Sequence, residues 1–315
     1  MKWICLIPVL AASCTWDWDR FEPRSGDGPS VDGPLLCSWQ DPARFTLAPP
    51  VPVTEINTAS AREIEPFLSP DGLTLYFASD RGDGKKRCYL ARRGKPEGPF
   101  DAVQEQSGIN VPDAMSRFAL SADGLTAYIA APRGYPKDAT GDAQLLAATR
   151  KGPREPFTSA QFAPLEALNT QANEWDPFPS TDGLRLYFAE HTPSKTQNRL
   201  MVAERSGPGA PWAKRGPVPG MDLSDLPPQT RSDNPAVTAD ELTIVFSSDH
   251  AGTIAGGRDL WYAVRADRTQ PFSAPRQLPA VNTDEWESEV TITPDGCRLY
   301  FTRVDDIYTT YYVPR

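Results

Sequence analysis

Three acidic residues stand at matching places in similar stretches of the chain. Glu65, Asp176 and Glu289 each lie six residues before an aspartate of a recurring phrase. Two or three carboxylates that converge on one glycosidic bond are what glycoside hydrolysis requires. The two other copies of this position hold Arg117 and Asn234. An arginine cannot act as a catalytic carboxylate, so its presence suits the binding of an anionic group better than hydrolysis.

Two tryptophans lie beside these positions, in the similar loops NEWDP and DEWESE. Trp175 and Trp286 could stack on sugar rings while carboxylates and guanidiniums bind hydroxyl or charged groups. The sequence therefore suggests one ligand-binding set, made of Glu65, Arg117, Trp175, Asp176, Asn234, Trp286 and Glu289. The alternative is that acids and bases on neighbouring repeats neutralise one another, and we favour that interpretation for the charged residues.

A metal site is a weaker hypothesis. His191 and His250 occupy related positions in neighbouring repeats, and an acid precedes each of them. Two imidazoles with two carboxylates would suit zinc or manganese. The other copies carry arginine at this place, so we favour the interpretation that each histidine replaces that arginine. We expect no metal and no cofactor.

The recurring phrase defines the elements that must position these residues. It occurs five times, as SPDGLTLYF at 69–77, SADGLTAYI at 121–129, STDGLRLYF at 180–188, TADELTIVF at 238–246 and TPDGCRLYF at 293–301. The Ser-x-Asp-Gly start predicts a tight hairpin turn, with glycine in the left-handed position. Glu241 replaces that glycine once, which should cost about 1 kcal/mol. On this basis alone, Glu241→Gly should raise the melting temperature.

The spacing of the phrase predicts the fold. Its copies are 52 to 59 residues apart, which is room for four short strands. Such sheets repeated about an axis form a β-propeller, here with five four-stranded antiparallel blades. Only three strands fit in the fifth copy, and an extra strand-like segment lies at 45–56. We therefore expect this N-terminal segment to be the outer strand of blade five and to close the ring, because closure removes both free edges.

The pattern Ser-x-Asp-Gly-x-x-Leu-Tyr-Phe-x-Ser-Asp-Arg, best kept at 69–81, resembles the WD40-like PD40 repeat of TolB-type propellers. The resemblance covers roughly 44–315 and implies a propeller domain over that range. Propellers of this group include binding scaffolds and enzymes, so the resemblance alone does not decide function. Five-bladed propellers also include glycoside hydrolases, which place an acid where this chain has Arg117.

The N-terminal residues suggest a lipid anchor. Residues 1–13 have a basic start and a short apolar run, and Leu-Ala-Ala-Ser-Cys at 10–14 resembles a bacterial lipobox. Cys14 would then be acylated, and residues 14–43, rich in Pro, Gly, Asp and Ser, would form a flexible tether. The residue after Cys14 resembles the default signal for the bacterial outer membrane, facing either the periplasm or the exterior.

Two further cysteines occupy apolar positions of the repeat. Cys88 and Cys297 align with leucine or isoleucine in other copies, so a buried free thiol is the favoured interpretation of each. Cys37 precedes the closing segment and should lie near the turn that carries Cys297. A Cys37–Cys297 disulfide is the alternative in an oxidising compartment.

The net charge and the absence of several catalytic motifs limit the classes of function to be considered. A formal net charge of −9 disfavours nucleic acid as a partner. The sequence lacks a glycine-rich phosphate loop, a Cys-x-x-Cys pair and a Gly-x-Ser-x-Gly turn. We therefore expect a monomeric, non-catalytic propeller that binds a protein or glycan in the bacterial envelope. A glycoside hydrolase or polysaccharide lyase that uses Glu65, Asp176 and Glu289 is the alternative.

Overall fold

The computed structural model describes residues 37–109, 116–135, 142–153, 155–191, 197–221, 230–249, 257–278 and 280–315. They all belong to one compact unit, Pro34–Arg315. The predicted leader at 1–13, the acylated Cys14, most of the tether and His250 lie outside the described residues. Within the described ranges, no helix is both long and apolar enough to cross a membrane.

Five antiparallel sheets form the blades of a β-propeller, which confirms the predicted fold class. The first four sheets have four strands each, and in each sheet the chain passes from the innermost strand to the outermost one. Blade one holds β3 (Glu63–Leu68), β4 (Thr74–Ser79), β5 (Arg87–Arg92) and β6 (Gln104–Glu105), and blade two holds β7 (Ser116–Leu120), β8 (Thr126–Pro132), β9 (Ala143–Thr149) and β10 (Ala163–Pro164). Blade three holds β11 (Asn173–Pro179), β12 (Arg185–His191), β13 (Asn198–Glu204) and β14 (Lys214–Pro217), and blade four holds β15 (Ser232–Val237), β16 (Thr243–Ser248), β17 (Asp259–Val264) and β18 (Arg276–Gln277).

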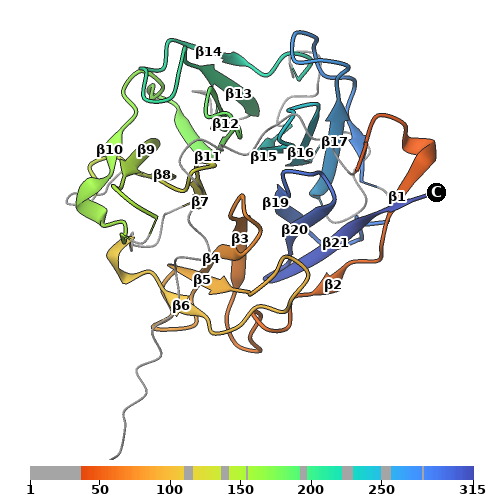
Figure 1. The fold of residues 1–315 in the computed structure, drawn as a ribbon, viewed down its shortest axis with the longest axis horizontal. Helices are drawn as coiled ribbons and strands as arrows, with labels where there is room; N and C mark the ends of the chain where they lie inside the picture. Colours follow the sequence, from red (N-terminus) through yellow and green to blue (C-terminus); the bar gives the residue numbers. More distant parts are fainter. Residues whose placement is uncertain are drawn as a thin grey trace, which may run out of the picture. The chain divides into compact units, whose positions relative to one another are not determined.

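Blade five is assembled from both ends of the described chain. Its inner strands are β19 (Glu287–Ile292), β20 (Arg298–Arg303) and β21 (Asp306–Pro314), and the short strands β1 (Phe45–Leu47) and β2 (Val51–Pro52) pair with β21. The N-terminal segment thus closes the ring as the sequence predicts. Figure 1 shows β3, β7, β11, β15 and β19 around the centre, with β6, β10 and β14 at the periphery.

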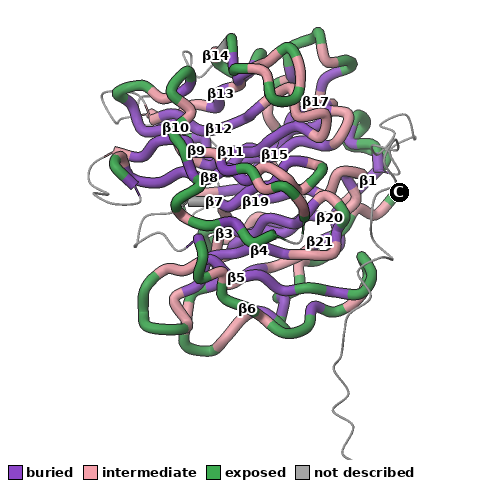
Figure 2. The backbone as a smooth tube through the Cα atoms, turned by 60° about the vertical axis from the view of Figure 1, so that its left-hand side comes forward, coloured by how far each residue is buried: buried purple, intermediate pink, exposed green. Residues whose placement is uncertain are grey.

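The second strand of each blade is buried on both faces (Figure 2). Large side chains such as Phe77, Tyr128 and Phe188 therefore pack between neighbouring blades, as the two-sided apolar pattern predicts. The remaining regular elements in the described ranges are three short 3-10 helices: η2 (Pro42–Arg44), η3 (Ser107–Ile109) and η4 (Ser159–Gln161).

The turn between the first two strands has the same chemistry in all five blades. The Ser or Thr hydroxyl donates to the turn aspartate at 2.5 to 2.7 Å, and that aspartate also accepts a backbone N–H two residues later. Gly72, Gly124, Gly183 and Gly296 have left-handed φ angles, and Glu241 has φ 58° at the same place. We call the end of the propeller that carries these turns the turn end.

An arginine follows the third strand of the first four blades and binds this turn. The guanidinium Nε donates to the carbonyl of the left-handed residue, and the planar group lies over the aromatic ring of the Pro-aromatic step, 4.4 to 4.7 Å from its centroid. We call this arrangement the arginine clamp; its four members are Arg93, Arg150, Arg205 and Arg265. The clamp explains why the sequence repeats both the arginine and the Pro-aromatic step.

Blade five replaces the arginine clamp with the N-terminal segment. Tyr312 stands at the clamp position, because its N–H binds the Cys297 carbonyl as the clamp arginines bind the corresponding carbonyls. Trp39 Nε1 donates to the Gly296 carbonyl at 2.8 Å and so takes the place of the guanidinium donor. Trp39 is 1% exposed and packs against Phe45.

A disulfide joins Cys37 to Cys297 beside this contact. The favoured sequence interpretation of Cys297, a buried free thiol, is therefore wrong, and the alternative is the one present. The repeat predicts only an apolar environment for Cys297. It carries no information on the N-terminal segment, which lies outside the repeat and packs against the same turn. Cys88 is a free, buried cysteine.

Candidate functional site

The five ring residues share an unusual backbone geometry. Each innermost strand contains a β-bulge, where two residues oppose one on the second strand. The first bulge residue has a left-handed φ of 24° to 57°, although none is glycine: Glu65, Arg117, Asp176, Asn234 and Glu289. Such a conformation costs about 1 to 3 kcal/mol for each residue and persists only where the surroundings enforce it. We call these five residues the ring, and the end of the propeller near them the ring end.

Side chains of the ring bind the backbone of the next blade. Glu289 Oε2 accepts the N–H of Glu65 at 2.7 Å, and Glu65 Oε2 accepts the N–H of Arg117 at 3.2 Å. Asp176 Oδ2 accepts the N–H of Asn234, and Asn234 Oδ1 accepts the N–H of Glu289, both at 3.3 Å. An arginine has no acceptor atom, so Arg117 cannot make the corresponding bond to blade three. The bulges thus supply N–H groups that cross-link four of the five blade junctions.

Arg117 instead extends across the channel. Its Nη1 donates to the carbonyl of Pro235 at 2.9 Å and its Nη2 to the carbonyl of Val290 at 2.6 Å, so it links blades two, four and five. The side chain is fully buried. Burial lowers the pKa of Arg117, and the nearby acids Asp176, Glu289 and Glu65 oppose this shift. The guanidinium is therefore held by backbone carbonyls, where the sequence analysis expected it to face a ligand.

Lys86 forms an ion pair with Glu65 at 3.0 Å and was not predicted from the sequence. It lies in the connection between β4 and β5, where neighbouring blades have unrelated residues. The net pKa of Glu65 is raised to about 7, because burial together with the nearby Glu289 and Asp176 outweighs the opposing effect of Lys86. Burial is the largest effect on Lys86 and lowers its pKa, but Glu65, Glu289 and Asp176 together outweigh burial, so the net pKa is raised. The three predicted carboxylates therefore interact electrostatically.

Arg258 is a second cation that the sequence analysis missed. It occupies the same place before β17 that Lys86 occupies before β5, and it forms an ion pair with Asp233. Burial lowers the pKa of Arg258, while Asp176 and Glu289 act in the opposite direction. Aligning the residues that precede each third strand would have pointed to both cations. Nothing in their spacing, however, shows that they reach the channel.

A second set of acids lies just outside the ring and is neutralised within the blades. Arg81 pairs with the buried Glu63 at 3.1 Å, and Arg303 pairs with the buried Glu287 at 2.8 Å. Threonine hydroxyls of the preceding loops also donate to both carboxylates. Arg81 and Arg303, which lie near the end of the second strand as His191 does in blade three, are thus bound within the structure.

The two candidate tryptophans have different surroundings. Trp175 is partly buried, its ring lies 6.0 Å from that of His191, and its Nε1 has no hydrogen-bond partner in the described part of the chain. Trp286 is 55% exposed. His191 Nε2 lies 3.9 Å from Asp233 Oδ1. Across the described ranges, no group of three or more His, Cys, Asp or Glu side chains could hold a metal ion.

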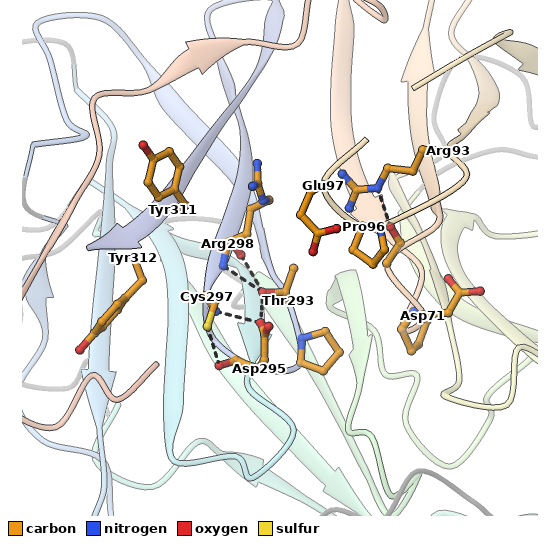
Figure 3. A pocket seen from close by; sticks show the side chains of 13 residues that line it. Asp71, Arg93, Pro96, Glu97, Thr293, Asp295, Cys297, Arg298, Tyr311 and Tyr312 are labelled. Carbon is orange, nitrogen blue, oxygen red and sulfur yellow. Dashed lines mark hydrogen bonds between the residues drawn. The ribbon is translucent and has the colours of Figure 1, made fainter. Parts of the chain in front are cut away.

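A cavity of about 410 Å³ lies at the turn end, between blades five and one (Figure 3). None of the seven predicted ligand-binding residues lines it. The sequence carries no sign of this cavity, because the departures from the repeat that mark the candidate site lie at the opposite end of the propeller.

Sheet topology and the ring define the chain as a five-bladed β-propeller with a polar, cross-linked channel. No protein-family model and no curated protein matches the sequence. An α-L-arabinofuranosidase from Lactobacillus brevis is similar in structure, with 15% identity, a TM-score of 0.53, and coverage of 84% of this chain and 94% of that one. A thermostable family-43 glycoside hydrolase has 12% identity, a TM-score of 0.56, and coverage of 82% and 91%. A putative TolB from Agrobacterium tumefaciens has 14% identity, a TM-score of 0.46, and coverage of 80% and 74%. Identities this low show the fold alone.

Proposed function

We propose that this chain is a lipid-anchored, non-catalytic propeller that binds a protein or glycan partner at its ring end. One observation carries the proposal: the ring carboxylates already accept hydrogen bonds from the backbone of neighbouring blades. Each of these bonds holds a ring carboxylate against the backbone of the next blade, so the carboxylates form part of the blade junctions. The ring therefore suits a rigid platform better than a catalytic centre.

Acylation of Cys14 would hold the propeller at the bacterial outer membrane, on the periplasmic or exterior side, as a monomer without a cofactor. The lipobox-like LAASC supports this part of the proposal, together with the resemblance of the repeat to the PD40 repeat of TolB-type propellers. The net charge of −9 favours neutral or cationic partners over nucleic acid.

The partner surface centres on Trp286. Trp286 is 55% exposed and lies next to Val304. Val304 is 56% exposed and donates its N–H to the Trp286 carbonyl. Val304 has a left-handed φ of 57°, which is rare for a β-branched residue. Exposed apolar side chains on a strained hairpin can contact a sugar ring or an apolar side chain of a protein. Trp175 and the ring residues Glu65, Asp176, Asn234 and Glu289 would line the inner part of the surface.

Capture of a partner from envelope extracts tests the proposal. Trp286→Ala should reduce the captured partner at least tenfold, and the Trp175→Ala, Trp286→Ala double variant should abolish capture. Val51→Ala removes a similarly exposed apolar side chain on β2 and should leave capture unchanged. Equal capture by all variants would exclude the ring end as the partner surface.

Glycoside hydrolysis is the second candidate, and the pKa of Glu65 favours it. A carboxyl group with a pKa of about 7 beside two other acids could act as a general acid. The two hydrolases of similar fold make glycosides the first substrates to assay. Glycoside turnover by the intact chain that disappears in a Glu65→Gln, Asp176→Asn variant would overturn the non-catalytic proposal. Thermal unfolding must show that this variant still folds.

A further inference from the structure

The junction between blades three and four contains a buried carboxylate. Glu241 is 0% exposed and lies at the left-handed turn position of blade four. It accepts hydrogen bonds from Arg185 Nη1 at 3.1 Å and from the Tyr187 hydroxyl at 2.5 Å, both from blade three. Two guanidiniums of its own blade add ion pairs, Arg268 at 3.4 Å and the clamp arginine Arg265 at 3.7 Å. This junction thus binds a carboxylate with two arginines and a tyrosine from the repeat.

The junction between blades five and one has the same three repeat residues but no carboxylate. Arg298 and Tyr300 of blade five stand at the repeat positions of Arg185 and Tyr187. The clamp arginine Arg93 of blade one corresponds to Arg265 and contacts the Tyr300 hydroxyl at 2.9 Å. Gly72 takes the place of Glu241.

The three other junctions do not repeat this set. Threonine replaces the first arginine in each of them, and the junction between blades four and five also lacks the tyrosine and the clamp arginine; the residues concerned are Thr74, Thr126, Thr243, Val245 and Tyr312. The two arginines and the tyrosine of the repeat therefore occur together at two junctions, and only one of these supplies its own acid. Arg268, which also pairs with Glu241, is replaced by Pro96 in blade one.

Gly72 lies at the wall of the cavity of about 410 Å³ between blades five and one (Figure 3). Gly72, Arg93 and Arg298 line it, and Tyr311 forms part of its wall. A β-carbon at Gly72 would lie 3.7 Å from Pro96 and 3.9 Å from Nη2 of Arg93, which are ordinary van der Waals contacts. Among the described residues, the guanidinium of Arg298 makes no hydrogen bond or ion pair, and its ring contact is Tyr311 at 5.8 Å.

We propose that this cavity, which we call the seam pocket, binds a carboxylate on a short unbranched aliphatic stem. The ligand would take the place that the Glu241 side chain takes between blades three and four. Arg298 would bind it in the way Arg185 binds Glu241, and Nη2 of the buried Arg93 would lie nearby. Asp71 and Asp295 use Oδ1 within their turns, and among the described residues neither carboxylate forms a hydrogen bond or ion pair with Arg93 or Arg298.

The ligand can be a small free acid or a glutamate side chain of another protein, since both carry the same chemical group. Glu97 is an exposed residue of the pocket lining. Its side chain could reorient toward Arg298 and compete with the ligand for the guanidinium. Its removal should therefore strengthen binding. The proposal concerns the turn end and does not depend on the function proposed for the ring end.

Propionate reproduces the Glu241 side chain beyond the α-carbon, and propionamide is its uncharged counterpart. Propionate titrated into the intact chain should raise the melting temperature and shift backbone amide resonances around Gly72 and Arg298, whereas propionamide should do neither. Arg298→Ala should weaken propionate binding at least tenfold, and Glu97→Gln should strengthen it several-fold. Equal responses to the two compounds, or an unchanged response in Arg298→Ala, would overturn the proposal.

Two turn variants test the equivalence of the junctions even if Arg298→Ala fails to fold. Gly72→Glu should fill the seam pocket and abolish the response to propionate. Glu241→Gly should open the junction between blades three and four and add a second propionate site with resonance shifts around Arg185. Absence of either change would contradict the inference. Comparing propionate with the blocked tripeptide acetyl-Gly-Glu-Gly-amide distinguishes the sources: tighter binding of the peptide indicates a protein ligand, and equal or weaker binding a free acid.

Discussion

The turn end and the ring end of the propeller differ in which features recur from blade to blade. At the turn end, four blades share both backbone and side chains, because the arginine clamp recurs with the same donor, acceptor and aromatic ring. At the ring end, all five blades share a β-bulge and a left-handed residue, yet the side chains at that residue include acids, an amide and an arginine. The backbone of the ring is therefore part of the repeat, while its side chains are specific to each blade. Differences in ring side chains are consequently the better guide to what this protein does.

The largest expected effect is at the ring end, where Arg117 links three blades. Arg117→Ala removes one of the buried cations that interact with Glu65, Asp176 and Glu289, and it leaves two carbonyls without their donor. We expect the free energy of unfolding to fall by about 3 to 5 kcal/mol, as measured by urea denaturation. Arg44→Ala, which removes a pair between exposed side chains, should cost less than 1 kcal/mol. Similar losses in the two variants would show that Arg117 does not cross-link the channel.

At the turn end, blade five lacks the arginine clamp and is held by the N-terminal segment, through the Trp39 hydrogen bond and the Cys37–Cys297 disulfide. Cys37→Ser with Cys297→Ser should lower the free energy of unfolding by about 2 to 4 kcal/mol, because the bond closes a loop of 260 residues. Reducing agent should destabilise the unaltered chain by a similar amount and the double variant not at all. If reduction leaves the melting temperature of the unaltered chain unchanged, blade five does not depend on the bond.

A change of pH should act mainly on the ring end. The pKa of Glu65 is raised from 4.5 to about 7 on folding, so its contribution to stability is complete below pH 4.5 and is lost as the pH rises through 7. The free energy of unfolding of the unaltered chain should therefore fall by about 1 to 3 kcal/mol between these pH values, and Glu65→Gln should abolish this fall. Denaturation of both proteins at pH 4.5, 6 and 7.5 measures the difference. Parallel stability curves would mean that Glu65 titrates normally.

The smallest effect concerns the one irregular turn. The left-handed φ of Glu241 alone predicts that Glu241→Gly stabilises the fold by about 1 kcal/mol. The structure reverses this expectation, because the substitution also removes the carboxylate that binds Tyr187 and Arg185. We now expect the free energy of unfolding, measured by thermal unfolding, to fall by a net amount of about 1 to 2 kcal/mol, with Glu55→Gly at an exposed position as the control for a new glycine. A rise in melting temperature would show that backbone strain outweighs the lost contacts.

Much of the fold could be predicted from the sequence because the Asp-Gly turn encodes its own hydrogen bonds. Ser69 and Asp71 satisfy the turn locally, so five copies indicate five hairpins without any knowledge of tertiary contacts. Ring closure followed from the same periodicity. The partners of Trp39 could not be predicted, because it lies outside the repeat and replaces an arginine only in three dimensions.

The candidate site was predictable in position but not in detail. Alignment of the copies places Glu65, Asp176 and Glu289 at one level of the channel, and their interaction shows in the raised pKa of Glu65. Their left-handed backbone gave no sequence signal, since glycine is absent from all five positions. Lys86 and Arg258 come from variable connections, whose reach depends on loop conformation and not on the repeat.

The disulfide at Cys37 also has a mechanical consequence. Cys37 precedes β1, and the bond attaches it directly to the turn between β19 and β20. A pulling force on the chain before Cys37 would pass through the sulfur atoms into the centre of blade five. The hydrogen bonds of β1 and the Trp39 contact would then carry almost no load. A propeller held by its N-terminal end could therefore withstand drag at a surface without opening its ring, and reduction of one bond would transfer that load to the three-residue strand β1.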